Sequence, residues 1–250
     1  MTGDEYLQVL LQKYSVNVAG AQAAGNLIYP VLAKWGDKYL NGAKFSGSLA
    51  KGTGISVSTD ADIFLSLSST TPGTLSDMYL SLYNAVTAAG YMARKQDVSI
   101  GVTVNGYSID LVPGRRQSQF GNDHSLYRNR KHTWIQTNID THISYIKASN
   151  RIKEIKILKL WRHQHGISIS SFYLELAAVA SLQNARIGNT AANVFRTFKY
   201  LRDNIEAARF IDPANTNNVV SDDYSRMEKS VIAAKAHESL QKRTWEEIVW

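Results

Sequence analysis

The stretch Phe45–Leu67, FSGSLAKGTGISVSTDADIFLSL, decides the fold that this chain of 250 residues can adopt. It contains a Gly47-Ser48 pair, a short polar connection, and then Asp60 and Asp62 at the start of an apolar run. Successive side chains of a β-strand point to opposite faces, so the two carboxylates share one face. The opposite face is apolar and carries Ala61, Ile63, Leu65 and Leu67. We therefore expect a strand with one buried face and two carboxylates standing together in a cleft.

A third carboxylate follows in a predicted β-hairpin. Residues 98–104 and 107–112 read as strands, and Asn105-Gly106 between them favours the positive φ angles of a tight hairpin turn. Pro113-Gly114 is expected to close this hairpin. Asp110 belongs to the second strand, where it can stand beside the first two carboxylates. Carboxylates at such short distances repel one another, and a bound cation would compensate their charge. The hard carboxylate oxygens select Mg²⁺ or Mn²⁺ for this role. The pattern favours a two-metal site for in-line phosphoryl transfer.

The order of these pieces resembles the nucleotidyltransferase fold of the DNA polymerase β superfamily. In that family a Gly-Ser pair opens a helix whose backbone N–H groups meet the triphosphate, and three carboxylates hold two metal ions. The resemblance implies that Gly47 and Ser48 bind the phosphates of an NTP. It also implies that Asp60, Asp62 and Asp110 are catalytic and hold two Mg²⁺ or Mn²⁺ ions. A glycine permits close backbone approach and a helix start attracts phosphate, which agrees with these roles. The alternative is that the three aspartates are loop-edge carboxylates and that the Gly-Ser pair is a turn.

Composition limits the class of protein. The apolar content of 44% and the charged content of 20% are typical of a globular chain, whose length suffices for one domain or two packed lobes. A net charge of +7 and a pI near 9.4 favour anionic partners such as nucleotides or nucleic acid. The absence of cysteine excludes disulfides and cysteine-zinc sites. Without an 18-residue apolar run or a signal-peptide pattern, we expect a cytoplasmic protein with no membrane segment.

The first half also contains three predicted helices. Capping boxes mark the starts of two of them, at Thr2 and Thr74, and the second of these is expected to end at Gly90. The remaining helix covers residues 19–40, in which Pro30 favours a kink or a restart. We expect the helix at Thr2 and the helix over residues 19–40 to pack against the back of the catalytic sheet.

Residues 115–133 form the most basic irregular segment of the chain. Phe120 and Tyr127 are interleaved with the basic side chains, a mixture that can follow a phosphate backbone and stack a base. The alternative is a solvated loop that crosses between two lobes. The residues expected to contact RNA in the first case are Arg115, Arg116, Arg128, Arg130 and Lys131.

The second half reads mainly as helices. Helical periodicity covers residues 151–165, an almost wholly apolar helix follows over residues 172–182, and a further helix spans residues 191–208. Ser171 is a natural N-cap for the apolar helix. A turn-rich segment, residues 212–225, precedes a last helix.

Three segments of this half, ILKLWR, SSFYLELAAVA and DPANTNNV, resemble a helical lobe that three groups of enzymes share. These groups are the bacterial cyclic-oligonucleotide synthases of antiphage systems (the SMODS or CD-NTase group), the oligoadenylate synthetases and the archaeal-type CCA-adding enzymes. GSLAKGT, DADIF and SIDLVPG look most like the SMODS group. The resemblance implies an α+β protein. A polymerase β-like lobe with a mixed sheet and helices would cover residues 1–145, and a closely packed helical lobe would cover residues 146–250.

The same resemblance implies further nucleotide-binding residues in the helical lobe. Lys159 corresponds to the lysine that contacts the β- and γ-phosphates of the donor nucleotide, and Ser171 corresponds to a serine that joins it. The next position often supplies a ring against the donor base, which would be Phe172 or Tyr173 here. An ammonium group suits phosphate and an aromatic ring suits any base face.

The expected reaction is transfer of a nucleoside monophosphate from an NTP to a hydroxyl group, with release of pyrophosphate. The resemblance points to cyclic or short linear oligonucleotide messengers made in antiphage defence. The alternative is a template-independent terminal nucleotidyltransferase that acts on RNA, such as a tRNA 3′ end. A catalytically idle nucleotide-binding module is a third possibility, against which the intact set of aspartates argues. The oligomeric state is not predicted.

Overall fold

The structure is a computed structural model that describes residues 1–58 and 60–250. The chain divides into two compact units. The sheet unit comprises Asn17–Lys51 and Thr59–Ile143, and the helical unit comprises Met1–Val16, Gly52–Ser58 and Ser144–Trp250. The sequence placed all of residues 1–145 in one lobe, whereas residues 1–16 and 52–58 belong to the helical unit. The reason is apolar burial, because Leu7, Leu10 and Ile55 lie in the core of the helical unit.

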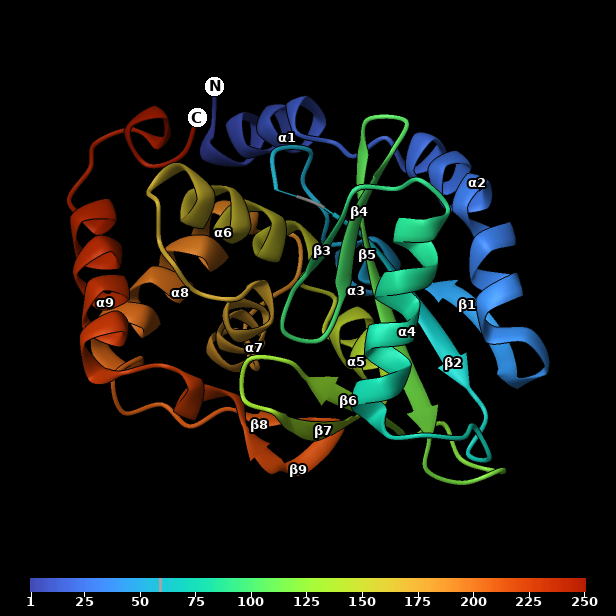
Figure 1. The fold of residues 1–250 in the computed structure, drawn as a ribbon. Coiled ribbons are helices and arrows are strands. Elements are labelled where there is room, and N and C mark those ends of the chain that lie inside the picture. The colour runs from blue at the N-terminus through green and yellow to red at the C-terminus, as the bar shows by residue number, and fades with distance from the viewer. Residues whose placement is uncertain (59) are drawn as a thin grey trace. The chain divides into compact units, whose positions relative to one another are not determined.

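The sheet unit is built on a mixed sheet with the strand order β1-β2-β5-β4-β3 (Figure 1). β2 and β5 are parallel, and β6 pairs with the end of β5 and with β7. The strands are β1 (Leu40–Phe45), β2 (Ala61–Leu67), β3 (Ala93–Lys95), β4 (Ile100–Val104), β5 (Tyr107–Arg116), β6 (His124–Arg128) and β7 (Thr133–Thr137). The helices of this unit are α2 (Val18–Gly36), η1 (Asp37–Tyr39), α3 (Gly47–Lys51) and α4 (Leu75–Ala88).

The two faces of this sheet differ as the alternation in β2 predicts. On one face Ala61, Ile63 and Leu65 are buried against apolar residues of α2 and α4, which form one core with them. The opposite face carries Asp62 of β2 and Asp110 of β5 at half-buried positions. The core therefore lies behind the carboxylates and leaves them accessible from the other side.

The predicted hairpin of β4 and β5 is confirmed at its turn and corrected at its end. Asn105 and Gly106 have φ angles of 47° and 79°, as the Asn-Gly pair requires. However, β5 does not close at Pro113 but continues through it. The pairing of β5 with β4 ends at Leu111, and the pairing with β6 begins at Arg115. Pro113 lies between the two, where its missing N–H costs neither partner a hydrogen bond.

The predicted helix signals are largely confirmed. The capping boxes at Thr2 and Thr74 are both formed, and they begin α1 (Gly3–Lys13) and α4. Gly90 follows the end of α4 with a φ of 91°, the left-handed conformation that favours glycine. α2 is one continuous helix that contains Pro30, so the predicted restart does not occur.

The helical unit surrounds one large apolar core. Its elements are α1, α5 (Ile139–Ala148, which begins in the sheet unit), α6 (Ile152–Gln164), α7 (Ser171–Ser181), α8 (Thr190–Asn204), β8 (Ile211–Asp212), β9 (Asn215–Val219), η2 (Val220–Asp223), α9 (Arg226–Leu240) and η3 (Trp245–Glu247). The ring of Trp161 lies 5.0 Å from that of Phe198, and its indole N–H donates to Ser239 Oγ over 2.9 Å. α1 packs in this core, so the expectation that it covers the sheet is wrong. Among the described residues, no helix has both the length and the apolar character needed to cross a bilayer.

Candidate active site

Gly47 lies between β1 and β2, where the backbone approaches the carboxylate of Asp62 closely. The backbone N–H of Ser46 donates to the carbonyl oxygen of Asp62 over 2.8 Å, which joins the end of β1 to the start of β2. Gly47 follows with a φ of +54°, and a Cβ added there would lie 1.8 Å from Asp62 Oδ2. Both the φ angle and the close approach therefore require glycine. Ser48 lies half-buried in the first turn of α3.

Asp62 and Asp110 are direct neighbours on parallel strands. They are register partners in the pairing of β2 with β5, and side chains opposite one another in a sheet share a face. Adjacent strands lie about 4.8 Å apart, so the two carboxyl groups start from positions within reach of one ion. The prediction that Asp110 stands beside Asp62 is confirmed by this register.

The surroundings of Asp110 show that negative charge accumulates at this site. Burial raises the pKa of Asp110, and the charge of Asp60 raises it further, while Arg94 and hydrogen bonding to Gln96 act in the opposite direction. Gln96 donates from Nε2 to Asp110 Oδ1 over 2.8 Å and accepts at Oε1 from Ser99 Oγ over 3.1 Å. Gln96 thus orients the carboxylate of Asp110.

Sequence reasoning missed this layer of supporting residues. Gly101 is the register partner of Asp110 on β4, and a Cβ there would lie 2.7 Å from the side-chain nitrogens of both Arg94 and Gln96. The glycine makes room for the groups that compensate and orient the carboxylate. No motif marks these positions, because they meet Asp110 only through the pairing of β4 with β5.

The donor set fits a divalent cation in its chemistry. Asp62 and Asp110 are neighbours in register, and Asp60 is close enough for its charge to act on Asp110. Hard carboxylate oxygens suit Mg²⁺ or Mn²⁺, and mutual repulsion of the carboxylates is what a cation would relieve. In the part of the chain that the structure describes, no three His, Asp or Glu side chains converge as a ready-made metal site.

The nucleotide-binding residues expected in the helical unit lie in a different setting. Lys159 is only 1% exposed and donates from Nζ to the carbonyl oxygen of Thr53 over 3.0 Å. The hydroxyl of Thr53 donates to Glu175 Oε1 over 2.7 Å, and Glu175 is also 1% exposed. A buried ammonium and a buried carboxylate are thus hydrogen-bonded to the same threonine. We call these three residues the Thr53 network.

The start of α7 differs from the expectation by one residue. Ser170, not Ser171, is the N-cap, and its hydroxyl accepts from the backbone N–H of Tyr173 over 3.1 Å. Ser171 is the first helical residue. Tyr173 is fully buried, its ring packs against Phe210 and Tyr224, and burial raises its pKa. Tyr173 is a core residue, so a role against a donor base would fall to the partly buried Phe172.

The basic segment is more ordered than the sequence suggested. Residues 115–133 contain the end of β5, all of β6 and the start of β7, so the expectation of an irregular segment holds only for residues 117–123 and 129–132. Arg115 donates to the carbonyl oxygens of Thr71 and Gly73, over 3.3 and 2.7 Å. Arg128 forms an ion pair with Asp97 at 3.2 Å. Arg115 and Arg128 therefore have structural partners within the sheet unit.

Comparison with known proteins identifies the architecture. No protein-family model matches the sequence, and no curated protein matches it. The structure, however, is similar to that of the CD-NTase CdnG of Bradyrhizobium diazoefficiens in complex with GTP. The TM-score is 0.79 at 14% identity, over 94% of this chain and 89% of that chain. CdnC of E. coli MS115-1 with ATP gives a TM-score of 0.74 at 21% identity, over 95% and 90% of the two chains. The chain has the polymerase β-like nucleotidyltransferase fold.

A third solved structure shows how widely this nucleotidyltransferase fold is shared. A cytoplasmic RNA terminal U-transferase matches with a TM-score of 0.65 at 12% identity, over 97% of this chain and 94% of that chain. The predicted α+β class is confirmed, and so is the similarity of the fold to that of the CD-NTase group. A shared fold does not by itself define a function.

Proposed function

We propose that this protein is a metal-dependent nucleotidyltransferase that moves a nucleoside monophosphate from an NTP to a hydroxyl group and releases pyrophosphate. The observation that carries the proposal is the register pairing of Asp62 with Asp110, with Gly47 held against the carboxylate of Asp62. This arrangement places carboxylates and a close-approach glycine on one end of one sheet face. The named neighbours of the same fold include structures with ATP and GTP, which supports an NTP as the donor.

Each residue of this site has a chemical task in the proposed reaction. Gly47 and Ser48 would present backbone N–H groups and a hydroxyl to the donor phosphates. Asp60, Asp62 and Asp110 would hold Mg²⁺ or Mn²⁺, and such ions, when bound, neutralise triphosphate charge and lower the pKa of an acceptor hydroxyl.

The proton of the acceptor would go to Asp110. As the hydroxyl oxygen bonds to the α-phosphorus, the bond from that phosphorus to the β-phosphate oxygen breaks and pyrophosphate leaves. Gln96 holds the carboxylate in place through its hydrogen bond to Oδ1.

Lys159 and Ser171 are proposed to serve the β- and γ-phosphates from the helical unit, with Phe172 against the donor base. In the structure Lys159 is hydrogen-bonded to Thr53, within the segment that connects α3 to Asp60 along the chain. It can therefore act on the phosphates directly, or on the segment that leads to the catalytic aspartates.

For the acceptor we favour another nucleotide, with cyclic or short linear oligonucleotide messengers of antiphage defence as products. CdnG, CdnC and the CdnE cyclic dinucleotide synthase match with TM-scores of 0.79, 0.74 and 0.71, the DncV cyclic AMP-GMP synthase with 0.60, and the RNA terminal U-transferase with 0.65. The second candidate is a terminal nucleotidyltransferase acting on RNA. It is supported by the match of that U-transferase to 97% of this chain and by the net charge of +7.

The test is incubation with four labelled NTPs and Mg²⁺ or Mn²⁺, with and without bulk tRNA, followed by separation of the products. Phosphatase-resistant small products formed without RNA would support the messenger synthase, and label confined to RNA would support the terminal transferase. Asp62→Asn should lower either activity at least about thousandfold, because a bound metal contributes several kcal/mol to stabilising the transition state.

Asp37→Asn is the matched control for this variant. Asp37 lies in the same unit and is exposed, and asparagine has the shape of aspartate without its charge. It should retain full activity. Turnover by a folded Asp62→Asn protein at the level of the Asp37→Asn control would refute the assignment of the metal carboxylates.

A further inference from the structure

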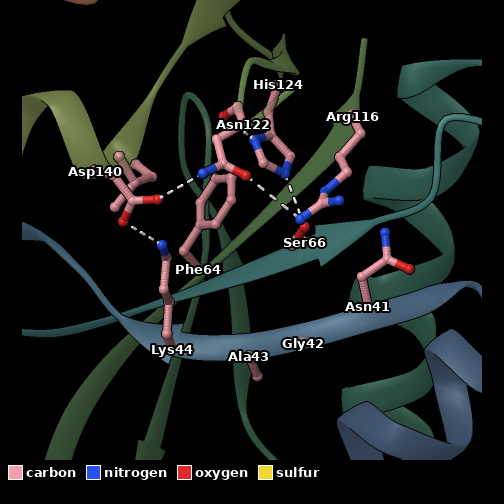
Figure 2. A pocket seen from close by; sticks show the side chains of 11 residues that line it. Asn41, Gly42, Ala43, Lys44, Phe64, Ser66, Arg116, Asn122, His124 and Asp140 are labelled. Atoms are coloured by element: carbon pink, nitrogen blue, oxygen red, sulfur yellow. Dashed lines mark hydrogen bonds and ion pairs between the residues drawn. The ribbon is translucent and has the colours of Figure 1, made fainter. Parts of the chain in front are cut away.

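A second polar cavity lies in the sheet unit, apart from the three aspartates. Its volume is about 190 Å³, and residues of β1, β2, β5, β6 and the start of α5 line it (Figure 2). We call it the β1–β6 pocket. Its polar lining is Asn41, Lys44, Ser66, Arg116, Asn122, His124 and Asp140.

The position of this pocket on the sheet separates it from the metal carboxylates. Ser66 lies four residues after Asp62 on β2, so both side chains share the face of the carboxylates. At a rise of about 3.3 Å per residue the two Cα atoms are about 13 Å apart. None of the three catalytic aspartates lines the pocket. A molecule bound here would therefore occupy a site of its own.

One wall of the pocket is a rigid hydrogen-bonded frame. His124 Nδ1 lies 2.8 Å from the carbonyl oxygen of Asn122, which can only accept, so Nδ1 carries the proton. Nε2 then accepts from the hydroxyl of Ser66 over 2.8 Å. Burial lowers the pKa of His124, which agrees with a neutral ring. The imidazole meets the Phe64 ring edge-on, with centroids 4.8 Å apart, as Figure 2 shows.

The opposite rim is held by an ion pair that is already complete. Lys44 Nζ lies 2.5 Å from Asp140 Oδ1, and Asn122 donates from Nδ2 to Asp140 Oδ2 over 3.2 Å. Figure 2 shows these side chains meeting across the pocket between β1 and α5. The single carboxylate of the lining is therefore already paired with the lysine.

Arg116 is the group in the pocket whose charge lacks compensation. Among the described residues its guanidinium forms no ion pair, and its one hydrogen bond is a long 3.5 Å contact to Asn122 Oδ1. Its Nε is buried without a partner in the described chain. The charges of Arg116 and Lys44 both act to lower the pKa of His124, while that of Asp123 acts to raise it. A buried, unpaired donor calls for an explanation, and a missing anionic partner is a direct one.

We propose that the β1–β6 pocket binds a small organic anion, a carboxylate or phosphate attached to a flat ring. The anionic group would accept from the guanidinium of Arg116, and the ring would lie against the apolar wall that Phe64 and Ile139 provide. Pockets for drug-sized ligands measure about 300–1,000 Å³, so a cavity of about 190 Å³ suits a fragment of about ten non-hydrogen atoms. This site is independent of the proposed nucleotidyl transfer.

The test uses benzoate, a carboxylate on a ring, and its neutral isostere benzamide. The full chain, without NTP or divalent cation, is titrated and followed by amide NMR shifts. Benzoate should bind with a roughly millimolar Kd, the strength expected of about nine non-hydrogen atoms, and should shift residues 41–44, 64–66 and 122–124. Benzamide should bind at least about tenfold more weakly, because a charge-assisted hydrogen bond is lost. Phenyl phosphate in a parallel titration tells whether carboxylate or phosphate is preferred.

Two variants test the site from different directions. Arg116→Gln should weaken benzoate binding at least about tenfold, whereas Arg130→Gln, an exposed arginine outside the pocket, should leave it unchanged. Gly42→Leu should abolish binding without removing a charge. Gly42 lines the pocket opposite Ser66 in register, and within the described chain a Cβ there meets nothing within 4 Å.

The proposal is overturned by any of three results. The first is the absence of a saturable shift up to about 100 mM benzoate, which is far above the expected Kd. The second is equal affinity for benzoate and benzamide. The third is undiminished benzoate binding by a folded Arg116→Gln protein. If Arg116→Gln does not fold, the Gly42→Leu titration decides, because that variant keeps the charges and fills the cavity.

Discussion

In the sheet unit, Asp62 and Asp110 stand side by side and burial raises the pKa of Asp110, whereas in the helical unit Lys159 and Glu175 are both hydrogen-bonded to Thr53. In the sheet unit, like charges lie close together at half-buried positions. In the helical unit, opposite charges are almost completely buried and are hydrogen-bonded to Thr53 of the same unit. A region that gathers like charges favours the binding of a cation, and a region whose buried opposite charges are hydrogen-bonded within the chain is a structural support.

The largest effect in this comparison is expected from a substitution of Gly47, which lies against the carboxylate of Asp62. Gly47→Ala should lower nucleotidyl transfer at least about a hundredfold, because the new Cβ would collide with the carboxylate of Asp62 and the φ of +54° disfavours any side chain. Steady-state rates of folded protein measure the effect. Gly90→Ala is the matched control, since Gly90 has a φ of +91° but a Cβ there meets nothing within 4 Å among the described residues.

Equal losses of activity in the two alanine variants would show that backbone strain alone is responsible. Such a result would remove the argument that Gly47 is required by its approach to Asp62. We expect Gly90→Ala to lose only stability, by about 1 kcal/mol, and to keep its activity.

Substitutions in the Thr53 network should lower the stability of the protein more than the rate of nucleotidyl transfer. Lys159→Met should lower the free energy of unfolding by about 2 kcal/mol, because the buried carbonyl of Thr53 loses its donor. Urea unfolding measures this change, and Lys153→Met on the exposed side of α6 is the control. Unchanged stability of Lys159→Met would contradict the description of this region as a support.

The same variants show whether Lys159 also touches the donor phosphates. Thr53→Val breaks the hydrogen bond to Glu175 without removing a charge. Direct phosphate contact predicts that the KM for NTP rises in Lys159→Met and not in Thr53→Val. A shared rise in both variants would assign the effect to the segment of residues 52–58 instead.

The smallest expected effect is the pH dependence of stability at Asp110. Because burial and Asp60 raise its pKa, the folded protein keeps this proton at pH values where the unfolded chain has lost it. The ionised group therefore opposes folding at neutral pH, and the opposition fades as the pH falls through the folded-state pKa. Asp110→Asn should raise the free energy of unfolding at pH 7, with the gain vanishing below the ordinary pKa of about 3.9.

Asp77→Asn should show the opposite sign. Hydrogen bonds from Thr74 lower the pKa of Asp77, so its contribution to stability is present at neutral pH and is lost as the pH falls through the folded-state pKa. Urea unfolding from pH 3 to pH 8 measures both variants. A loss of stability at pH 7 in Asp110→Asn would contradict the raised pKa of Asp110.

Much of the fold was accessible from the sequence, because its signals are local. The alternation in β2 predicted which face is buried, the capping boxes predicted the starts of α1 and α4, and Asn105-Gly106 predicted a hairpin turn. Each depends on residues within a few positions of one another. One prediction that failed, the end of β5, needed knowledge of strand partners. Pro113 looked like a strand end, yet it is tolerated where one partner strand stops and the next begins.

By itself, the sequence determined the pieces of the candidate site and their order: Gly47-Ser48, then Asp60 and Asp62, then Asp110. Only the tertiary structure decided what surrounds them. It brought Gln96 to Asp110, placed residues 52–58 in the helical unit, and assembled the β1–β6 pocket from five elements. The physical reason is that backbone preferences and alternation act over a few residues. Partners separated by tens of residues meet only once strand pairing and apolar burial have selected one arrangement.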